Sequence, residues 1–246
     1  MNNCEEQLPK VKAHDKTVGI LGGVGSESTA RFFLKLIKNT PAKTDQDHLR
    51  IFIDNNPNIP DRTQAILGLG VSPVEEANKS IEVLENAGAE IIAIPCNTMH
   101  YFYPELQAST KVPIINMITE TASYIQKAFP DMKKIGLLAT TGTIMTRLYH
   151  DAINGIELIT PNEELQEKVM NSIYGEEGIK AGYTEGHPRD DILEVIEVLI
   201  EKGAEAIILG CTELTLLSLK EDVPVPLVDP SLVLAEVVVK KARLQI

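Results

Sequence analysis

The sequence has no tryptophan, few other aromatic residues and no long apolar run. Tyrosine and phenylalanine number only 6 and 5, so the composition does not indicate a platform on which nucleic-acid bases stack. No apolar run approaches the roughly 18 residues that a membrane span needs. Basic residues are outnumbered, with 23 Lys and Arg against 35 Asp and Glu, and the net charge is −12. A strongly acidic chain without a basic cluster predicts neither nucleic-acid nor membrane partners.

Cysteine is also scarce, with 3 residues in a chain of 246. An odd, low number argues against a disulfide framework and favours a reducing compartment. The first 16 residues are polar and lack the apolar stretch of a signal peptide. We therefore expect a cytoplasmic protein. Cys4, inside this polar segment, is not expected to take part in the function.

Short apolar runs rich in β-branched residues alternate with longer amphipathic segments along the chain. This alternation is typical of βαβ units, in which helices cover a parallel sheet. The length suits one large domain or two small ones. The runs expected to form strands are 17–22, 50–54, 90–95, 134–139, 156–160 and 206–210.

The two halves of the chain repeat each other. The stretch AGAEIIAIPCNTMH at 87–100 returns as KGAEAIILGCTELT at 202–215, and each copy carries a cysteine where the apolar run stops. A second pair of stretches, at 17–25 and 134–142, also matches. The general likeness of βαβ units accounts for the matching strands, but poorly for a rare cysteine in the same place twice. The repeat predicts a duplicated α/β architecture.

We predict two pseudo-symmetric, Rossmann-like α/β domains, each with a mostly parallel sheet. The first spans 1–116 and the second 117–228, with a linking helix near 116–128 and the final helix, 229–246, packing back on the first domain. Open parallel sheets bind ligands beyond the carboxyl ends of their strands. Two such halves that face each other would enclose a small molecule in the cleft between them.

The cysteines of the repeat, Cys96 and Cys211, are the strongest candidates for chemistry. Each is expected one residue past a strand and just before a helix. A helix N-terminus favours thiolate over thiol, and a free thiol titrates near about 8.5, so a modest shift makes it a usable base. A single buried cysteine is usually inert. Two at equivalent places, each followed by polar groups, indicate a catalytic pair.

The polar groups that follow the thiols are Asn97 and Thr98 in the first half, and Thr212 and Glu213 in the second. These side chains can orient the thiols, change their pKa values or contact a substrate. Glu213 poses a problem of sign, because a nearby carboxylate opposes thiolate formation. The alternative is that Glu213 holds a substrate ammonium group or a water.

A metal site is the other way to use a cysteine. His100 stands four residues after Cys96, but no CxxC or HxxxH spacing accompanies the pair, and no histidine adjoins Cys211. We therefore expect no metal. His100 is expected to be a helix residue or to support its neighbours.

A glycine-rich turn at 19–28 precedes an expected helix, but it matches neither GxGxxG nor the P-loop pattern. No nucleotide is therefore expected. The turn still offers backbone N–H groups to an anion, and a carboxylate would serve as well as a phosphate. Val24 in this turn and Thr141 in its counterpart in the second half are candidate substrate contacts.

Two basic residues stand where they could hold a carboxylate. Arg62 lies in NNPNIPDRT, a polar loop after a strand, and a guanidinium suits bidentate carboxylate recognition. The alternative is a surface arginine paired with Asp61. Lys180 lies in a glycine-spaced stretch that would fold over the cleft, and its alternative is a solvated lysine.

The motifs GILGGVG, NNPNIPDRT, CNTMH, IY followed closely by a lysine, and GCTE occur in this order. Together they resemble the cofactor-independent aspartate/glutamate racemases, over about residues 17–230. The resemblance implies a pseudo-symmetric two-domain fold with a small acidic amino acid bound between the domains. It also implies that no pyridoxal phosphate or other cofactor is needed, and that the protein is a homodimer.

The resemblance also assigns roles by position. Cys96 and Cys211 match the two catalytic cysteines, which act as acid and base in a two-base proton transfer. The residues that match substrate contacts beside the first thiol are Asn97 and Thr98, and those that match groups holding substrate carboxylates are Arg62 and Lys180.

Some positions depart from the family pattern. Val24 stands where many relatives have Met, and Met99 where many have Ala. The choice between aspartate, glutamate or both stays open. The alternative functions are another paired-cysteine enzyme, such as a maleate isomerase or hydantoin racemase, and a two-lobed binding protein. The NNPNIPDRT loop together with Lys180 favours an acidic amino acid over a hydantoin.

Overall fold

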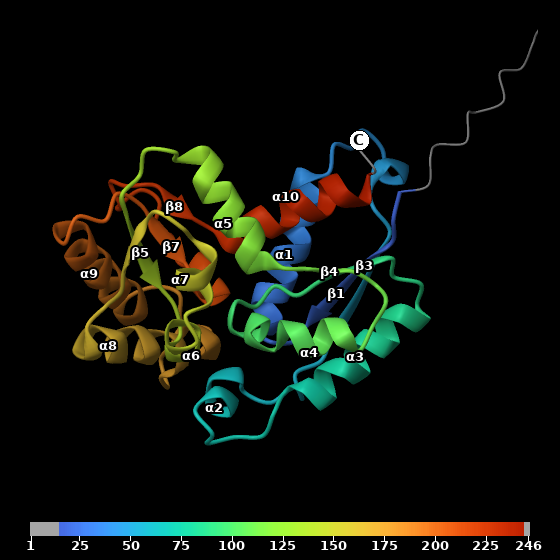
Figure 1. Ribbon diagram of the computed structural model, residues 1–246, viewed down its shortest axis with the longest axis horizontal. Coiled ribbons are helices and arrows are strands. Elements are labelled where there is room, and N and C mark those ends of the chain that lie inside the picture. The colour runs from blue at the N-terminus through green and yellow to red at the C-terminus, as the bar shows by residue number, and fades with distance from the viewer. Residues whose placement is uncertain (1–14, 244–246) are drawn as a thin grey trace, which may run out of the picture.

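The computed structural model describes residues 15–243, and Figure 1 shows two α/β halves that lie side by side. Each half contains a four-stranded sheet in which all neighbouring strands are parallel. The strand orders, β2-β1-β3-β4 and β6-β5-β7-β8, are equivalent. The predicted fold class, two parallel α/β domains of the same architecture, is confirmed. Within residues 15–243, no helix is long and apolar enough to cross a membrane.

The first half is a series of strand–helix units around β1 (Val18–Gly22). This strand is buried along its whole length, as expected for a parallel strand covered on both faces. The other elements are α1 (Ser26–Asn39), the 3-10 helix η1 (Asp45–Asp47), β2 (Ile51–Asn55), α2 (Arg62–Ile66), α3 (Val74–Asn86), β3 (Ile91–Ala93), the 3-10 helix η2 (Thr98–Phe102), α4 (Tyr103–Ala108) and β4 (Ile114–Ile115).

The second half repeats this plan around β5 (Lys134–Leu138), which is buried except at its first residue. The further elements are α6 (Thr141–Met145), α7 (Leu148–Ala152), β6 (Glu157–Ile159), α8 (Glu163–Tyr174), the 3-10 helix η3 (Ile179–Ala181), α9 (His187–Glu201), β7 (Ile207–Leu209), the 3-10 helix η4 (Thr212–Leu216) and β8 (Leu227–Val228).

A matched pair of glycines explains why the two central strands repeat. A Cβ on Gly19 of β1 would lie 2.9 Å from the Cβ of Ala89. A Cβ on Gly136 of β5 would lie 2.5 Å from Cδ1 of Ile207. Glycine at these two positions lets Ala89, just before β3, and Ile207, in β7, approach the central strand of each half closely.

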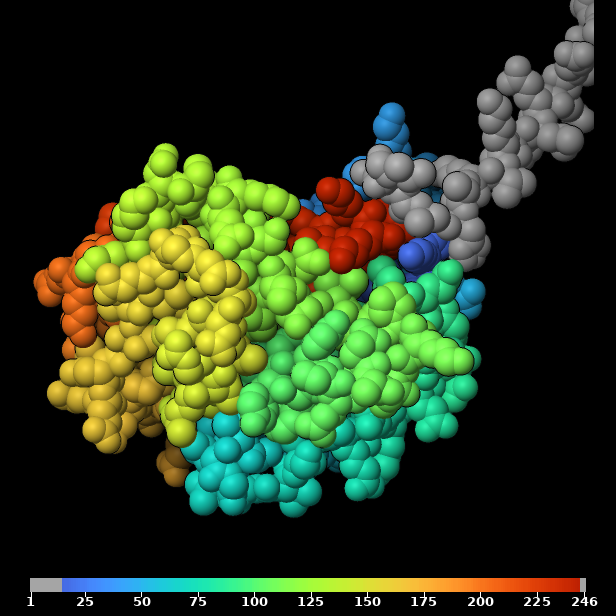
Figure 2. Space-filling model, in the orientation of Figure 1, coloured from blue at the N-terminus to red at the C-terminus, as the bar shows by residue number. Residues whose placement is uncertain are grey.

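Two long helices connect the halves. α5 (Met117–Ala128) leads into the second half and buries Ile125 in the core of the second sheet. α10 (Pro230–Ala242) returns and buries Val238 in the core of the first sheet. The two helices pack against each other where the halves meet (Figure 1, Figure 2). The division of the chain into domains at residue 116 stays a prediction.

The edge strands β4 and β8 were not expected from the sequence. Each has only two residues, which is too short for an apolar pattern to stand out. Each follows a proline, Pro113 or Pro226, which has no N–H to donate to a sheet.

The strands that precede the two cysteines are shorter than predicted. Ile94 and Pro95 separate Cys96 from the end of β3, and Gly210 separates Cys211 from the end of β7. The prediction that each cysteine lies one residue past its strand is therefore wrong. Proline cannot donate to the strand ladder and glycine weakens it, so both strands end early.

Candidate active site

The loops that carry Cys96 and Cys211 lie beyond the carboxyl ends of β3 and β7 and meet each other. Both cysteines are buried, each with 6% exposure. The Thr212 hydroxyl, next to Cys211, donates to the carbonyl of Pro95, next to Cys96, at 3.4 Å. The repeat therefore brings both thiols to one site. The helices expected after the thiols are the five-residue 3-10 helices η2 and η4.

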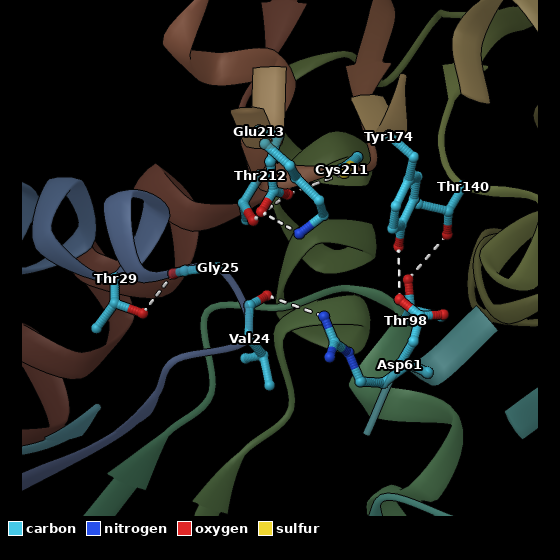
Figure 3. A network of polar contacts seen from close by, with 12 residues as sticks. Val24, Gly25, Thr29, Asp61, Thr98, Thr140, Tyr174, Cys211, Thr212 and Glu213 are labelled. Carbon is cyan, nitrogen blue, oxygen red and sulfur yellow. Dashed lines mark hydrogen bonds and ion pairs between the residues drawn. The ribbon is translucent and has the colours of Figure 1, made fainter. Parts of the chain in front are cut away.

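A cavity of about 370 Å³ adjoins this contact, and both halves contribute to its walls. Its lining includes two cations, a phenol, the first turn of α1 and three carboxylates, those of Glu27, Asp61 and Glu213. Figure 3 shows the η4 residues Thr212 and Glu213 on one side of this region and Tyr174 above Asp61 on the other. The residues that matter for the chemistry are Ser28, Arg62, Tyr174, Lys180 and Glu213.

Cys211 is bonded to a carboxylate. Its Sγ donates to Oε2 of Glu213 at 3.0 Å, while Oε1 of Glu213 lies 2.9 Å from the Nζ of Lys180. Burial raises the pKa of the Cys211 thiol well above its ordinary value, and Glu213 adds to the rise. Although burial disfavours its charge, Lys180 and the Cys211 bond hold the pKa of Glu213 below its ordinary value. Cys211 is therefore a thiol beside an ionised Glu213.

Gly25 allows the Glu213 carboxylate to reach this position. A Cβ on Gly25 would lie 2.2 Å from Oε1 of Glu213. The φ angle of Gly25 is 122°, a conformation that side chains other than glycine rarely adopt. The glycine-rich turn therefore makes room for a carboxylate of the other half of the molecule.

Arg62 is buried beside the other thiol, with 8% exposure. Its Nη1 donates to the carbonyls of Ile59 and Pro60, and its Nη2 donates to the carbonyl of Val24 at 3.3 Å. Burial works against the guanidinium charge, but nearby groups, with Cys96 first among them, outweigh it and raise the pKa of Arg62. The alternative of a surface arginine paired with Asp61 is wrong.

Tyr174 spans the cleft. From the end of α8 in the second half, its hydroxyl donates to Oδ2 of Asp61 in the first half at 3.1 Å (Figure 3). The Nζ of Lys180 lies 5.3 Å from the centre of the Tyr174 ring. Desolvation of the phenol raises the pKa of Tyr174, although 39% of the residue is exposed. Asp61 also caps α2 by accepting from the Gln64 amide at 2.8 Å.

Asn97 has the two ends of its amide in different surroundings. Its Oδ1 accepts a hydrogen bond from the hydroxyl of Tyr149 at 2.5 Å. Its Nδ2 is one of the buried side-chain atoms in residues 15–243 that have no hydrogen-bond partner. Asn97 therefore keeps a donor available next to Cys96.

The threonines lie in the contact between the halves. The Thr98 hydroxyl is 2.9 Å from the hydroxyls of both Thr140 and Thr143. Thr141 accepts from Gln166 at 3.3 Å, and its amide donates to the sulfur of Met170. Thr98 and Thr141 both make protein contacts, and their role as substrate contacts stays a prediction.

His100 supports the loop of the first thiol. Its Nε2 accepts from the Met117 amide at 3.0 Å, so Nδ1 carries the hydrogen and donates to the carbonyl of Cys96 at 2.8 Å. Burial lowers the pKa of His100. Across residues 15–243, no group of three His, Cys, Asp or Glu side chains could hold a metal ion.

Some residues of the site were not among the sequence candidates. Ser28 lines the cavity, and its buried hydroxyl has no hydrogen-bond partner. Tyr174 is the tyrosine of the IY motif, so its place before Lys180 was a usable signal. Tyr149 carries no signal in the sequence, because an apolar helix position looks the same whether or not its hydroxyl is used. Cys4 lies outside the described residues.

The comparison with known proteins agrees with this arrangement. A family model described as Asp/Glu/Hydantoin racemase matches residues 21–238. The chain belongs to this family. The resemblance inferred from the five sequence motifs is thereby confirmed.

Individual racemases are similar over nearly the whole chain. RacX of Bacillus subtilis (strain 168), a broad specificity amino-acid racemase, is 29% identical over 227 residues, which cover 89% of this chain and 95% of RacX. The structure of Picrophilus torridus aspartate racemase has 34% sequence identity and a TM-score of 0.82, with 92% of this chain and 94% of that chain covered. Francisella tularensis glutamate racemase, solved with D-glutamate, shares the fold at 23% identity and a TM-score of 0.65, over 91% of this chain and 79% of that one.

Proposed function

We propose that this family member is a cofactor-independent amino-acid racemase that interconverts the enantiomers of aspartate, glutamate or both. Cys96 and Cys211 are its two bases, one for each face of the substrate. Membership of the Asp/Glu/Hydantoin racemase family and the similarity to RacX and to an aspartate racemase support an isomerase rather than a binding protein.

The observation that carries the two-base proposal is the opposite charge beside the two thiols. Cys96 lies next to the buried, positively charged guanidinium of Arg62. Cys211 donates to the carboxylate of Glu213, which favours the protonated thiol. Racemisation by two bases needs one thiolate and one thiol at the start, and these neighbours supply that asymmetry.

The proton transfer balances with these two groups alone. The Cys96 thiolate takes the α-proton, so the Cα–H bond breaks and an S–H bond forms. The Cys211 thiol then gives its proton to the opposite face of the α-carbon, which leaves Cys211 as the thiolate. The reverse turnover, or proton exchange with water, restores the first state. Lys180 offsets the charge on the Cys211 side while that thiolate exists.

The cavity suits a small acidic amino acid. Among its lining residues, Arg62 and Lys180 offer two cationic groups and Ser28 offers a hydroxyl donor. The Asn97 amide, next to Cys96 in the sequence, has a further donor without a partner. Negative charge that develops on the α-carbon and carboxylate in the transition state would be stabilised by such fixed donors in a buried site. Glu213 is engaged by Cys211 and Lys180, which favours a role in holding the Cys211 proton over a role in holding the substrate ammonium.

The resemblance to the racemases also leads us to propose a homodimer that needs no cofactor, and the low, odd number of cysteines leads us to propose a cytoplasmic location. Size-exclusion chromatography with light scattering tests the dimer. Turnover after dialysis against EDTA, without added pyridoxal phosphate, tests the lack of a cofactor. Lost activity that zinc or pyridoxal phosphate restores would contradict that part of the proposal.

The reaction itself is tested by chiral chromatography of L- and D-aspartate and L- and D-glutamate incubated with the protein. We expect at least one pair to reach an equal mixture. Maleate and a hydantoin are run in parallel, because other enzymes with paired cysteines act on them. Turnover of either, without turnover of an acidic amino acid, would replace the proposed substrate.

A further inference from the structure

A hydrogen bond buried between the two halves ends at the residue next to the first thiol. Tyr149 lies in α7 of the second half and is completely buried, while Asn97 follows Cys96 in the first half and is 2% exposed. The phenolic oxygen of Tyr149 lies 2.5 Å from Oδ1 of Asn97. The second half of the molecule therefore holds the side chain of Asn97.

This bond fixes which way the Asn97 amide faces. An amide accepts at its oxygen and donates at its nitrogen, so a phenol that donates must meet Oδ1. Burial raises the pKa of Tyr149, and the phenol thus keeps its proton and remains a donor. With Oδ1 held by Tyr149, Nδ2 must face the other way.

The Nδ2 group that results is buried and has no partner within residues 15–243. A buried donor without a partner is costly, and such groups are rare in folded proteins. Asn97 also adjoins Cys96, whose sulfur must lie against the α-carbon of the substrate in the proposed reaction. The carboxylate attached to that carbon is the nearest acceptor that the reaction brings.

We propose that Tyr149 is a positioning residue, which orients the Asn97 amide so that Nδ2 donates to a carboxylate oxygen of the substrate. The inference rests on the proposed racemase function. The ring of Tyr149 packs in the core with Ile118, Ile135 and Leu137, and a phenylalanine would keep these contacts. Only the hydroxyl is needed to hold the amide.

The test uses substrate binding rather than turnover. Iodoacetamide alkylates the thiols, mass spectrometry of the Cys96 and Cys211 peptides follows each rate, and added aspartate or glutamate protects them. In Tyr149→Phe, we expect the half-protecting concentration to rise about tenfold, which corresponds to about 1.4 kcal/mol of binding free energy. The alkylation rates without substrate should stay as in the wild type, because the Tyr149 hydroxyl donates to Asn97 and not to a thiol.

Two further variants separate positioning from packing. Asn97→Ala should raise the half-protecting concentration as much as Tyr149→Phe does, and the double variant should raise it no further. Additive effects would show that Tyr149 acts elsewhere and would overturn the proposal. Tyr103→Phe is the matched control, because it removes a phenol that donates to the carbonyl of Ile114 and should leave protection unchanged.

Asn97→Asp keeps the inference testable if Tyr149→Phe does not fold. The aspartate retains an acceptor for Tyr149 but loses the Nδ2 donor, so protection should weaken by more than tenfold. Wild-type protection in Asn97→Asp, or in a folded Tyr149→Phe, would overturn the inference while leaving the racemase proposal intact. If no acidic amino acid protects the wild-type thiols or is racemised, the proposed function fails and the inference falls with it.

Discussion

Cys211 donates the hydrogen of its thiol to the Glu213 carboxylate across 3.0 Å. This contact answers the problem of sign that a carboxylate beside a catalytic cysteine poses. The carboxylate does not assist a thiolate at Cys211 but keeps the proton on the sulfur, and Lys180 keeps the carboxylate ionised. Among residues 15–243, no carboxylate is bonded in this way to Cys96, whose charged neighbour is Arg62.

The first prediction concerns Glu213→Gln. The variant removes the negative charge next to Cys211 and frees Lys180, so the pKa of the Cys211 thiol should fall. Since alkylation follows the thiolate fraction, its rate at Cys211 near neutral pH should rise roughly tenfold for each unit that the pKa falls. Racemisation should slow, because the proton that Cys211 must deliver is less firmly held. The rate is measured in a Cys96→Ala background by mass spectrometry of the Cys211 peptide.

Glu221→Gln serves as the control for this experiment, because it removes an exposed carboxylate nearby in the sequence. It should change neither the alkylation rate nor the turnover. An unchanged Cys211 rate in Glu213→Gln would mean that Glu213 does not hold the proton of the thiol.

The second prediction concerns Arg62→Lys. Lysine keeps the charge but cannot make the bonds by which Arg62 holds the carbonyls of Ile59, Pro60 and Val24. We expect kcat/KM to fall by a factor of about 10 to 100, as for the loss of one charged hydrogen bond. The free energy of unfolding should also fall, by about 1–3 kcal/mol, because the guanidinium is buried. Steady-state kinetics and urea unfolding measure the two effects.

Arg50→Lys is the matched control, because Arg50 is exposed and lies over the ring of Phe52, 5.0 Å from its centre. It should leave kcat/KM unchanged. Wild-type kinetics of Arg62→Lys with every acidic amino acid would show that the guanidinium does not bind substrate.

The sequence predicted the architecture well because the repeat is visible in it. Apolar strand runs, the glycine pair Gly19 and Gly136, and the two cysteines each recur in the second half, and the sheets have equivalent strand orders. The edge strands β4 and β8 were not predicted, because two residues after a proline are too few to show the apolar pattern of a strand.

The electrostatics of the site could not be predicted in the same way. The sequence predicted a helix N-terminus at each thiol, which would favour the thiolate equally at both cysteines. The structure has short 3-10 helices there and sets the thiols apart by their partners, Arg62 and Glu213. Arg62 is far from Cys96 in the sequence, so only the fold reveals the contact. Tyr149 and Asn97 are also far apart in the sequence, so the hydrogen bond between them is visible only in the fold.

The third prediction concerns pH and His100. Burial lowers the pKa of folded His100, whereas in the unfolded chain it is near about 6.5. Above that pH the residue is neutral in both states and has no effect. Below it the unfolded state binds a proton that the folded state does not, so the free energy of unfolding falls by up to about 1.4 kcal/mol per pH unit. His100→Gln should therefore show a shallower loss of stability between about pH 6.5 and 5.

Urea unfolding at several pH values measures how steeply the free energy of unfolding falls in acid. His187→Gln is a control for which we expect the opposite change in steepness. A backbone hydrogen bond and then the charge of Asp191 raise the pKa of the exposed His187, so its contribution is present at low pH and lost as pH rises through the folded pKa. Removing it should steepen the loss in acid. Equal slopes in His100→Gln and the wild type would show that His100 is protonated in the folded protein.

The last prediction concerns the two thiols themselves. If Cys96 and Cys211 serve opposite faces of the substrate, Cys96→Ala and Cys211→Ala should each abolish racemisation, because a proton must be both taken and delivered. In D₂O each variant keeps one base, which can remove the α-proton of one enantiomer and return deuterium to the same face. The two variants should therefore exchange opposite enantiomers, slowly and without inversion.

Because of the contact with Glu213, we expect the exchange rates of the two variants to depend differently on pH. Cys211 is held as a thiol, so exchange by Cys96→Ala should be slow at neutral pH and should increase as pH rises towards the raised pKa of Cys211. Cys211→Ala lacks the thiol that is bonded to Glu213, so its exchange is the comparison for this pH profile. Proton NMR of the α-position, with each enantiomer and with the double variant as background, measures all four rates. If both variants exchange the same enantiomer, or if either racemises at the wild-type rate, the two thiols do not act as opposed bases.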